Sequence, residues 1–170
     1  EAYALVDGSN SFGDDASNTI VQEMENYRDD VIVIFAGYPD KMKSFLDRNE
    51  GLRSRIAFHV NFPDYSTDEL LEILKLMAKD KSYTLDDDLF VKCKEIFASV
   101  RRHPEFGNGR FVRNMLEQAI MKQSVRIYEN YGNKKVSKKE VCTLKTEDFD
   151  ESIAAPFKGV YAVKHIGFMG

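Results

Sequence analysis

The spacing of apolar residues predicts alternating helices and strands in the first part of the chain. Apolar side chains recur every three or four residues in two segments, which predicts amphipathic helices. A third segment is a continuous, largely β-branched run, which is typical of a strand buried on both faces of a parallel sheet. A fourth, which ends before Pro63 and Asp64, is also predicted to be a strand. In chain order these are a helix at 16–27, a strand at 31–37, a helix beginning at Pro39 and a strand at 56–62. This order forms a βαβ unit, so we expect a right-handed connection.

Polar residues predict where these two helices begin and end. Asp14 or Asp15 is placed to cap the first helix. Residues 49–51 are expected to end the second helix, so that 49–55 form a loop before the second strand. The expected buried stripes are Ile20, Met24 and Tyr27 in the first helix and Met42, Phe45 and Leu46 in the second.

The second part of the chain has a helical period throughout. Ser66 and Glu69 are spaced as a capping box, in which each side chain accepts a hydrogen bond from an unpaired amide of the first turn. Further helices are predicted at 85–100 and about 110–128, followed by a short helix with Thr146 as its cap. The expected buried residues are Leu70, Leu74 and Met77, then Leu89, Cys93, Ile96 and Val100, and then Met115, Leu116, Ala119 and Ile120.

Composition and charge narrow the class of protein. The 170 residues are 43% hydrophobic, which suits one domain or two small ones, and no apolar run is long enough to span a membrane. The net charge of -4 argues against nucleic-acid binding, which leaves a lysine patch as a minor alternative. That patch contains Lys134, Lys135, Lys138 and Lys139.

The cysteines and the first residues favour a reducing, cytoplasmic location. Cys93 and Cys142 lack the spacing of a zinc site or of a disulfide framework. The chain does not begin with the pattern of a secretory signal, and we expect it to be a fragment or the visible part of a longer protein. The pattern of His, Cys, Asp and Glu indicates no metal site and no catalytic triad.

Two arginines stand out between the second predicted helix and the second predicted strand. Arg53 and Arg55 are separated by one residue, so at least one of them should project outward. One interpretation is a solvated pair or a surface salt bridge. The other is an anion clamp, because planar guanidinium groups match phosphate oxygens. Arg55 directly precedes the strand and is therefore the better anchored of the two.

A second basic segment follows a glycine-rich turn. Gly107 and Gly109 allow close backbone approach, and a helix start attracts anions, so Arg110 in the first turn is placed to contact a phosphate. Alternatively, the glycines belong to an ordinary loop, and Arg113 pairs with Glu117 one turn later.

Two further candidates lie in the first part of the chain. Glu1 precedes a short apolar stretch and could be a catalytic carboxylate at a strand end, although a terminal Glu is more often simply exposed. Tyr38 follows the strand at 31–37, at the edge where α/β folds bind ligands, but it could equally serve packing.

These motifs recur in a fixed order in one known family. They are Glu-Ala-Tyr-Ala-Leu at 1–5, Phe-Gly at 12–13, Met-Glu-Asn-Tyr-Arg-Asp-Asp at 24–30, the apolar run with Tyr-Pro at 31–39, Gly-Leu-Arg-Ser-Arg at 51–55 and Phe-Pro-Asp-Tyr-Ser at 62–66. The chain resembles the carboxyl-terminal part of an AAA+ ATPase of the CbxX/CfqX type, a family that includes red-type rubisco activases and stage V sporulation protein K. The resemblance is strong over 1–64, good over 110–118 and thin beyond.

The resemblance implies an α/β fold with a partial parallel sheet. Residues 1–64 would form part of a P-loop NTPase-like AAA+ core, residues 65–155 an α-helical lid domain and residues 156–170 a tail. The family's sheet order places a further strand between those at 31–37 and 56–62, and this sequence lacks it. The two segments would then pair directly, accept a strand from another chain or belong to a longer protein.

The resemblance also implies roles for the candidate residues. Glu1 matches the Walker B glutamate that orients the attacking water, and Tyr38 falls at sensor 1. Arg55, or less favourably Arg53, matches the arginine finger that reaches the nucleotide of the neighbouring subunit. Arg110 matches the sensor 2 arginine, which contacts phosphates in its own subunit, and Arg113 beside it is a second candidate for nucleotide binding.

The complete protein would therefore be a ring-forming remodelling motor, by resemblance a hexamer, that uses ATP and magnesium and acts on a protein substrate. The sequence contains no GxxxxGK[ST] motif, no aspartate before Glu1 and no aromatic pore loop. We therefore expect this chain alone to be inactive as an ATPase. The alternative is a non-catalytic oligomerisation or interaction module derived from the same fold.

Overall fold

The computed structural model of the chain describes residues 1–5, 12–104 and 106–158. Contacts divide the chain into two units, Glu1–Phe62 and Pro63–Gly170, which we call unit 1 and unit 2 and describe separately. Most of the predicted tail at 156–170 lies outside the described residues.

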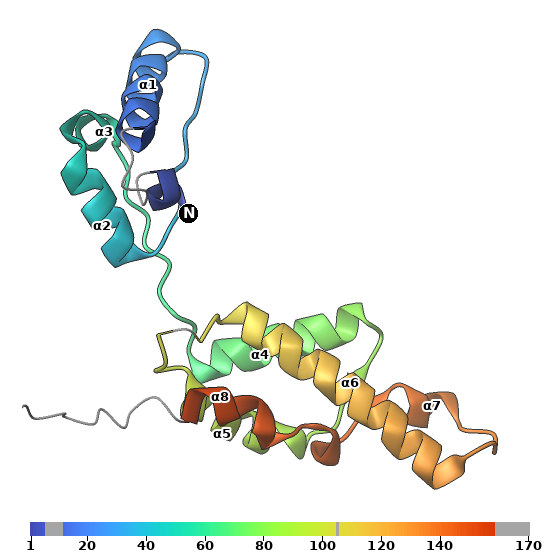
Figure 1. Cartoon of the computed structure of the whole chain (residues 1–170). Coiled ribbons are helices and arrows are strands. Elements are labelled where there is room, and N and C mark those ends of the chain that lie inside the picture. The colour runs from blue at the N-terminus through green and yellow to red at the C-terminus, as the bar shows by residue number, and fades with distance from the viewer. Residues whose placement is uncertain (6–11, 105, 159–170) are drawn as a thin grey trace, which may run out of the picture. The chain divides into compact units, whose positions relative to one another are not determined.

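Unit 1 contains short helices and extended segments (Figure 1). Its helices are the 3-10 helix η1 (Ala2–Leu5), α1 (Phe12–Asn26), α2 (Pro39–Arg48) and α3 (Glu50–Arg55). The loop predicted at 49–55 is wrong, because Asn49 ends α2 and at once caps α3. Its side-chain oxygen accepts a hydrogen bond from the backbone N–H of Leu52 at 3.0 Å. Both arginines of the predicted loop therefore lie on helix α3.

The small core of unit 1 forms where η1, α2 and α3 meet. Tyr3, Phe45, Leu46 and Leu52 are buried there. Partly buried residues packed against them include Ile20, Met24, Met42 and Phe35. Two predictions for α1 are wrong. Asp14 and Asp15 lie within its first turn rather than before it, and Tyr27 follows its last residue and is 51% exposed.

The two predicted strands of unit 1 do not form a sheet. Residues 31–37 and 56–62 are extended, but in the part of unit 1 that the structure describes neither pairs as a strand. Their outward side chains are highly exposed, with Ile32 at 90%, Phe58 at 87% and Phe62 at 87%. A strand is completed by hydrogen bonds to a neighbour, and propensity cannot replace that neighbour. The expectation that the two segments pair directly is therefore wrong.

Unit 2 is a helical unit (Figure 1), and it also contains one short pair of parallel strands. Its elements are α4 (Thr67–Asp80), β1 (Thr84–Leu85), α5 (Leu89–Val100), α6 (Gly109–Tyr131), α7 (Lys138–Val141), β2 (Thr143–Leu144), η2 (Thr146–Asp148), η3 (Glu151–Ala154) and α8 (Ala155–Lys158). The strand register places Thr84 opposite Thr143 and Leu85 opposite Leu144.

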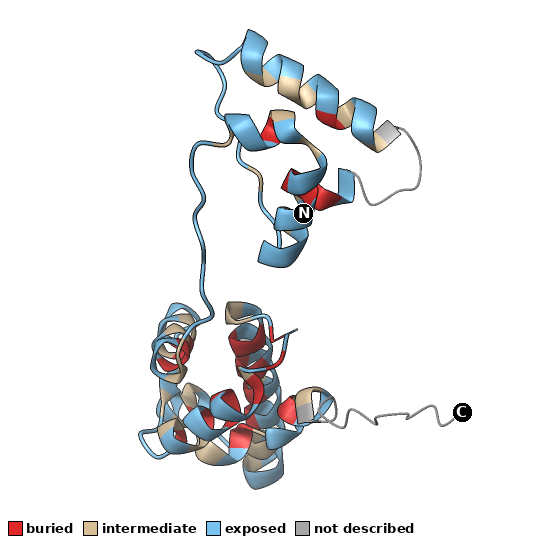
Figure 2. Ribbon diagram, turned by 90° about the vertical axis from the view of Figure 1, so that its left-hand side faces the viewer, coloured by how far each residue is buried: buried red, intermediate tan, exposed pale blue. Residues whose placement is uncertain are grey.

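The core of unit 2 lies where α4 packs against α5 and α6 (Figure 2). Most of the predicted core residues are confirmed. The buried ones are Leu70, Leu74, Leu89, Cys93, Ile96, Val100, Met115, Leu116 and Ala119. Met77 and Ile120 are partly buried against the same core. Unit 2 therefore has a continuous apolar interior, as the helical period predicts.

Local signals in unit 2 are confirmed where they depend on neighbouring residues alone. The capping box forms, with Ser66 N–H donating to Glu69 at 2.8 Å and Glu69 N–H donating to Ser66 Oγ at 3.2 Å. The helix predicted at 85–100 instead begins at Leu89, because residues 84–85 pair with β2. Thr146 is the first residue of η2 rather than its cap, a place taken by Lys145.

Candidate functional site

The turn before α6 presents Arg110 to solvent. Gly107 and Asn108 both have positive φ angles, of 73° and 47°, and Gly109 then starts the helix. Arg110 N–H donates to the carbonyl of Gly107 at 2.9 Å, which closes the turn. The Arg110 side chain is exposed, and among the residues that the structure describes it forms no ion pair. The turn therefore holds an uncompensated positive charge at the first turn of a 23-residue helix.

The residues after Arg110 fix this helical turn in the core. Phe111 is 4% exposed and Val112 is 0% exposed. The Phe111 ring packs against Phe97 of α5 with a centroid distance of 6.3 Å and against Phe106 with a distance of 5.3 Å. Because the backbone is anchored on this side, Arg110 projects from a rigid position rather than from a loose loop.

Arg113 is exposed one turn further along the same helix. The spacing in the sequence allows an ion pair between Arg113 and Glu117, but among the described residues these two side chains form none. Arg110 and Arg113 are three residues apart and thus neighbours on the helix surface. The structure therefore brings two of the predicted phosphate-binding arginines together on α6.

Arg53 and Arg55 lie on the last turn of α3 in unit 1, and each contacts a carboxylate of its own unit. Arg55 Nε lies 3.2 Å from Glu25 Oε2, and its Nη1 donates to the carbonyl of Gly51 at 3.2 Å. Arg53 Nη1 lies 3.3 Å from Asp47 Oδ1. The side chain of Arg55 is 34% exposed and that of Arg53 is 66% exposed, so both pairs are surface pairs. Within unit 1, Arg53 and Arg55 thus form surface salt bridges, which was the first of the two interpretations of this arginine pair.

The other two candidates of unit 1 are exposed. Glu1 precedes the 3-10 helix η1, so the expectation that it lies at a strand end is not met within this unit. Tyr38 is 60% exposed and is the residue before α2, whose first turn contains Pro39. Its position after the extended segment at 31–37 agrees with the sequence, but that segment is unpaired here.

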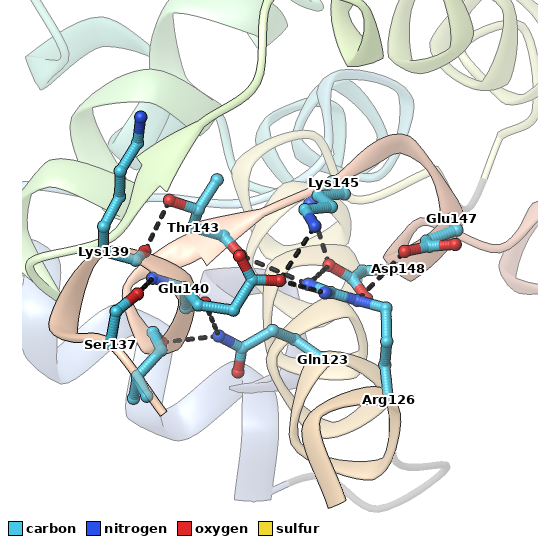
Figure 3. Close-up of polar contacts among 10 residues, drawn as sticks. Gln123, Arg126, Ser137, Lys139, Glu140, Thr143, Lys145, Glu147 and Asp148 are labelled. Carbon is cyan, nitrogen blue, oxygen red and sulfur yellow. Dashed lines mark hydrogen bonds and ion pairs between the residues drawn. The ribbon is translucent and has the colours of Figure 1, made fainter. Parts of the chain in front are cut away.

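A cluster of charged residues surrounds Arg126 in the second half of α6 (Figure 3). The Arg126 side chain is 10% exposed, and its Nε and Nη2 lie 2.8 and 2.9 Å from the two carboxylate oxygens of Asp148. Its Nη1 lies 3.1 Å from Glu140, and its Nη2 donates to the carbonyl of Thr143 at 3.3 Å. Glu147 lies 3.2 Å from Nε. Arg126 thus joins α6 to α7, β2 and η2.

The pKa values around Arg126 favour the charged forms. Hydrogen bonds to Asp148 raise the pKa of Arg126 above its ordinary value. A hydrogen bond from Lys145, at 2.8 Å, lowers the pKa of Glu140, and the same contact raises the pKa of Lys145. Sixteen residues separate Arg110 from Arg126, which is about 24 Å along a helix. The cluster is therefore a structural network and does not belong to the Arg110 turn.

Sequence reasoning missed both the Arg126 network and the contacts of Asn108. The network joins residues 14 to 22 positions apart, and Asn108 contacts residues 43 and 44 positions away. A single sequence carries no spacing signal for such contacts. The lysine patch considered for nucleic-acid binding lies in and before α7, where Lys138 and Lys139 are exposed.

The described residues contain neither a helix that could span a membrane nor a metal-binding group of side chains. None of the helices in residues 1–5, 12–104 and 106–158 combines the length and the apolar character needed to cross a membrane. Over the same residues, no three His, Cys, Asp or Glu side chains gather in a group that could hold a metal ion.

Comparisons with known proteins define the class of unit 2. Residues 66–158 match the AAA lid domain family. The chain is 45% identical over 134 residues to protein CfxQ of Xanthobacter flavus, which covers 78% of this chain and 42% of that protein. It is 41% identical over 154 residues to a chloroplastic ribulose bisphosphate carboxylase/oxygenase activase of Cyanidioschyzon merolae, which covers 89% of this chain and 52% of that protein. A CfxQ homolog of Guillardia theta is 40% identical over 154 residues, with shares of 89% and 52%.

The helical unit that carries Arg110 is thus the lid domain of an AAA+ protein. The chain belongs to the AAA+ family of the CbxX/CfqX type, as its motifs indicate. It spans about half the length of the curated relatives it matches.

Proposed function

We propose that the complete protein is an ATP-driven AAA+ motor that remodels a protein substrate, and that Arg110 is its sensor 2 residue. The observation that carries this proposal is the exposed Arg110 at the start of α6, which precedes the buried residues Phe111 and Val112 and has no ion-pair partner among the described residues. A guanidinium group in this setting is ready to bind a phosphate of ATP without first breaking another contact. Arg113, one turn away, adds positive charge to the same surface.

Arg55 is proposed as the arginine finger that reaches the nucleotide of a neighbouring subunit. Its contact with Glu25 does not oppose this role, because exposed ion pairs contribute only about 0–1 kcal/mol and are readily exchanged for another anion. Arg53 is the alternative, with an even more exposed pair to Asp47. A finger stabilises the charge that develops on the phosphoryl group, so its loss should lower turnover more than nucleotide affinity.

Glu1 and Tyr38 are proposed to act from an AAA+ core that the extended segments of unit 1 would complete. Apolar residues alternate along 56–62 at Phe58, Val60 and Phe62, and all three are exposed, as expected of a strand without its neighbour. In the complete protein these segments would join a parallel sheet. Glu1 would then orient the attacking water, and Tyr38 would lie near the phosphates as sensor 1.

ATP, with its magnesium ion, is the proposed cofactor of the complete protein. When bound, it supplies the phosphoryl group whose transfer drives remodelling. The residues of this chain contribute the positive charges of Arg55 and Arg110 and the carboxylate of Glu1. The cytoplasmic location, a hexameric ring and the absence of nucleic-acid binding stay predictions. Two relatives are named ribulose bisphosphate carboxylase/oxygenase activases, which supports a protein as the substrate.

Steady-state ATP hydrolysis by the complete protein tests these assignments. Arg55→Ala should lower kcat by about 10³-fold or more and change KM for ATP little. Arg110→Ala should raise KM and lower kcat together. Arg53→Ala and Arg113→Ala are matched controls, since each removes a neighbouring arginine from the same helix. A larger loss in the two controls than in their partners would transfer the roles to Arg53 and Arg113.

Mixed rings separate action on a subunit's own nucleotide from action on its neighbour's. A Glu1→Gln subunit has an inactive site of its own but an intact finger. Mixed with Arg55→Ala subunits, it should restore activity, because the finger acts across the interface. Mixed with Arg110→Ala subunits, it should restore none. The opposite pattern would contradict both assignments.

A non-catalytic oligomerisation module is the second candidate function, and the exposed apolar residues of the extended segments favour it. Sedimentation of this 170-residue chain, with and without ATP, distinguishes the two. The motor predicts no nucleotide-dependent assembly and no ATP hydrolysis by this chain alone. Assembly without nucleotide would favour the module, and magnesium-dependent turnover would refute the expected inactivity.

A further inference from the structure

The Asn108 side chain connects the start of α6 to the first residues of unit 2. Its Oδ1 accepts a hydrogen bond from the backbone N–H of Tyr65 at 3.0 Å. Its Nδ2 donates to Asp64 Oδ1 at 2.6 Å. The two contacts fix the orientation of the carboxamide, because the reverse orientation would place donor against donor and acceptor against acceptor. We call these contacts the Asn108 bridge.

The backbone at Asn108 is in a conformation that favours glycine. Its φ of 47° is combined with a ψ of -115°, which lies outside the left-handed helical region that asparagine tolerates. Asn108 also stands at the N-cap position of α6, yet its side chain makes no capping hydrogen bond. Asparagine at this position usually caps the helix. Both features indicate that the side chain is directed instead to Asp64 and Tyr65.

The residues joined by the bridge have rigid neighbours on both sides. Tyr65 is followed by the capping box of α4, in which Ser66 and Glu69 exchange two hydrogen bonds. Asn108 is followed by Gly109 and then by Arg110, which precedes the buried Phe111. A shift of the Arg110 turn would therefore either break the two hydrogen bonds of Asn108 or displace the backbone at 64–65 with it. Residues 64–65 are the place where the chain passes into the lid.

We infer that Asn108 is a positioning residue for Arg110, and that it couples phosphate binding at Arg110 to the orientation of the segment at 64–65. This inference rests on the proposed role of Arg110. The Asn108 carboxamide is engaged by Asp64 and Tyr65 and is not required to bind the nucleotide itself. It holds the Arg110 turn against Asp64 and Tyr65, so that an Arg110 drawn toward a phosphate moves this segment with it. Without the Asn108 bridge, Arg110 would still bind a phosphate, but its turn would no longer be held against residues 64–65.

The first test is amide hydrogen exchange on the 170-residue chain, which needs no nucleotide. Asn108→Ala should speed exchange of the Tyr65 amide by about tenfold, the factor expected for one lost hydrogen bond. Asn108→Gly should do the same even though it relieves the backbone, because it also lacks the carboxamide. Asn114→Ala is the matched control, since Asn114 is an exposed asparagine on the same helix. Unchanged exchange at Tyr65 in both Asn108 variants would overturn the inference.

An exchanged pair tests the geometry of the bridge. Asn108→Asp alone puts a carboxylate oxygen in place of the Nδ2 group that donates to Asp64 at 2.6 Å. The two carboxylates repel each other and should separate, so exchange at Tyr65 should again rise about tenfold. Asp64→Asn alone keeps an acceptor for Asn108 and should change little. Combining the two substitutions restores a donor at 64 and acceptors at 108, so it should return exchange to the original rate. Failure of this rescue would contradict the bridge.

The second test asks whether Asn108 acts through Arg110 in the complete protein. Asn108→Ala should raise KM for ATP about tenfold, and adding it to Arg110→Ala should cause no further loss. A merely structural defect would add to the Arg110→Ala defect. Additive losses would therefore overturn the inference and leave the proposed function standing. If Arg110→Ala itself changes nothing, the proposed function fails, while exchange at Tyr65 still reports on the bridge.

Discussion

Removing Arg126 should destabilise unit 2 strongly, because it leaves a buried carboxylate without its main partner. Asp148 is 1% exposed, and it accepts from Arg126 at 2.8 and 2.9 Å. In Arg126→Met both contacts disappear, while the backbone N–H of Lys145 still donates to Asp148 at 2.8 Å. Breaking a buried ion pair by removing one partner costs about 3–5 kcal/mol. Because one donor remains, we expect the lower end of this range, about 3 kcal/mol.

Removing the charge of Asp148 as well should recover most of this loss. In the double variant Arg126→Met with Asp148→Asn, the new amide oxygen still accepts from the Lys145 backbone and no buried charge remains. We expect a net cost of about 1 kcal/mol, close to that of one lost hydrogen bond. Lys122→Met is the matched control on the same helix, because its partner Asp150 is 36% exposed and an exposed pair contributes little.

Urea denaturation of the full chain, followed by far-UV circular dichroism, measures these differences in the free energy of unfolding. The helices of unit 2 supply most of the helical signal. The reasoning would be refuted if Arg126→Met cost no more than Lys122→Met, or if the double variant were less stable than Arg126→Met alone. Either result would mean that the network around Arg126 does not depend on compensating a buried charge.

Two further predictions concern titration. Lys122 donates to Asp150 and, with the backbone N–H of Ser152, lowers the pKa of this carboxyl from 3.8 to about 2. The small stability that this exposed pair contributes is therefore complete above pH 4 and is lost as the pH falls toward 2. Lys122→Met should remove this part of the pH dependence of urea unfolding, and an unchanged dependence would argue against the pair. Burial raises the pKa of the Cys93 thiol to about 12. A thiol reagent at pH 8 should therefore label the partly exposed Cys142 before Cys93, and mass spectrometry measures the order of labelling. Faster labelling of Cys93 would contradict its burial.

The sequence alone determined the helices and the core of unit 2. Their signals are local, since a residue three or four positions away decides which face of a helix is apolar. The capping box at Ser66 and Glu69 depends on residues three apart and formed as expected. The family could also be identified from the sequence, because its motifs are short segments in a fixed order.

Only the tertiary structure decided what depends on distant partners. The segments at 31–37 and 56–62 have the composition of strands, yet in unit 1 they stay unpaired, since a strand needs a neighbour that composition does not supply. Leu85, the first residue of the helix predicted at 85–100, belongs instead to β1, because β2 pairs with it from 59 positions further along the chain. The hydrogen-bond partners of Arg126 and Asn108 could not be predicted from the sequence either. Such contacts exist only once folding has brought distant backbone segments together, and a single sequence does not record which segments meet.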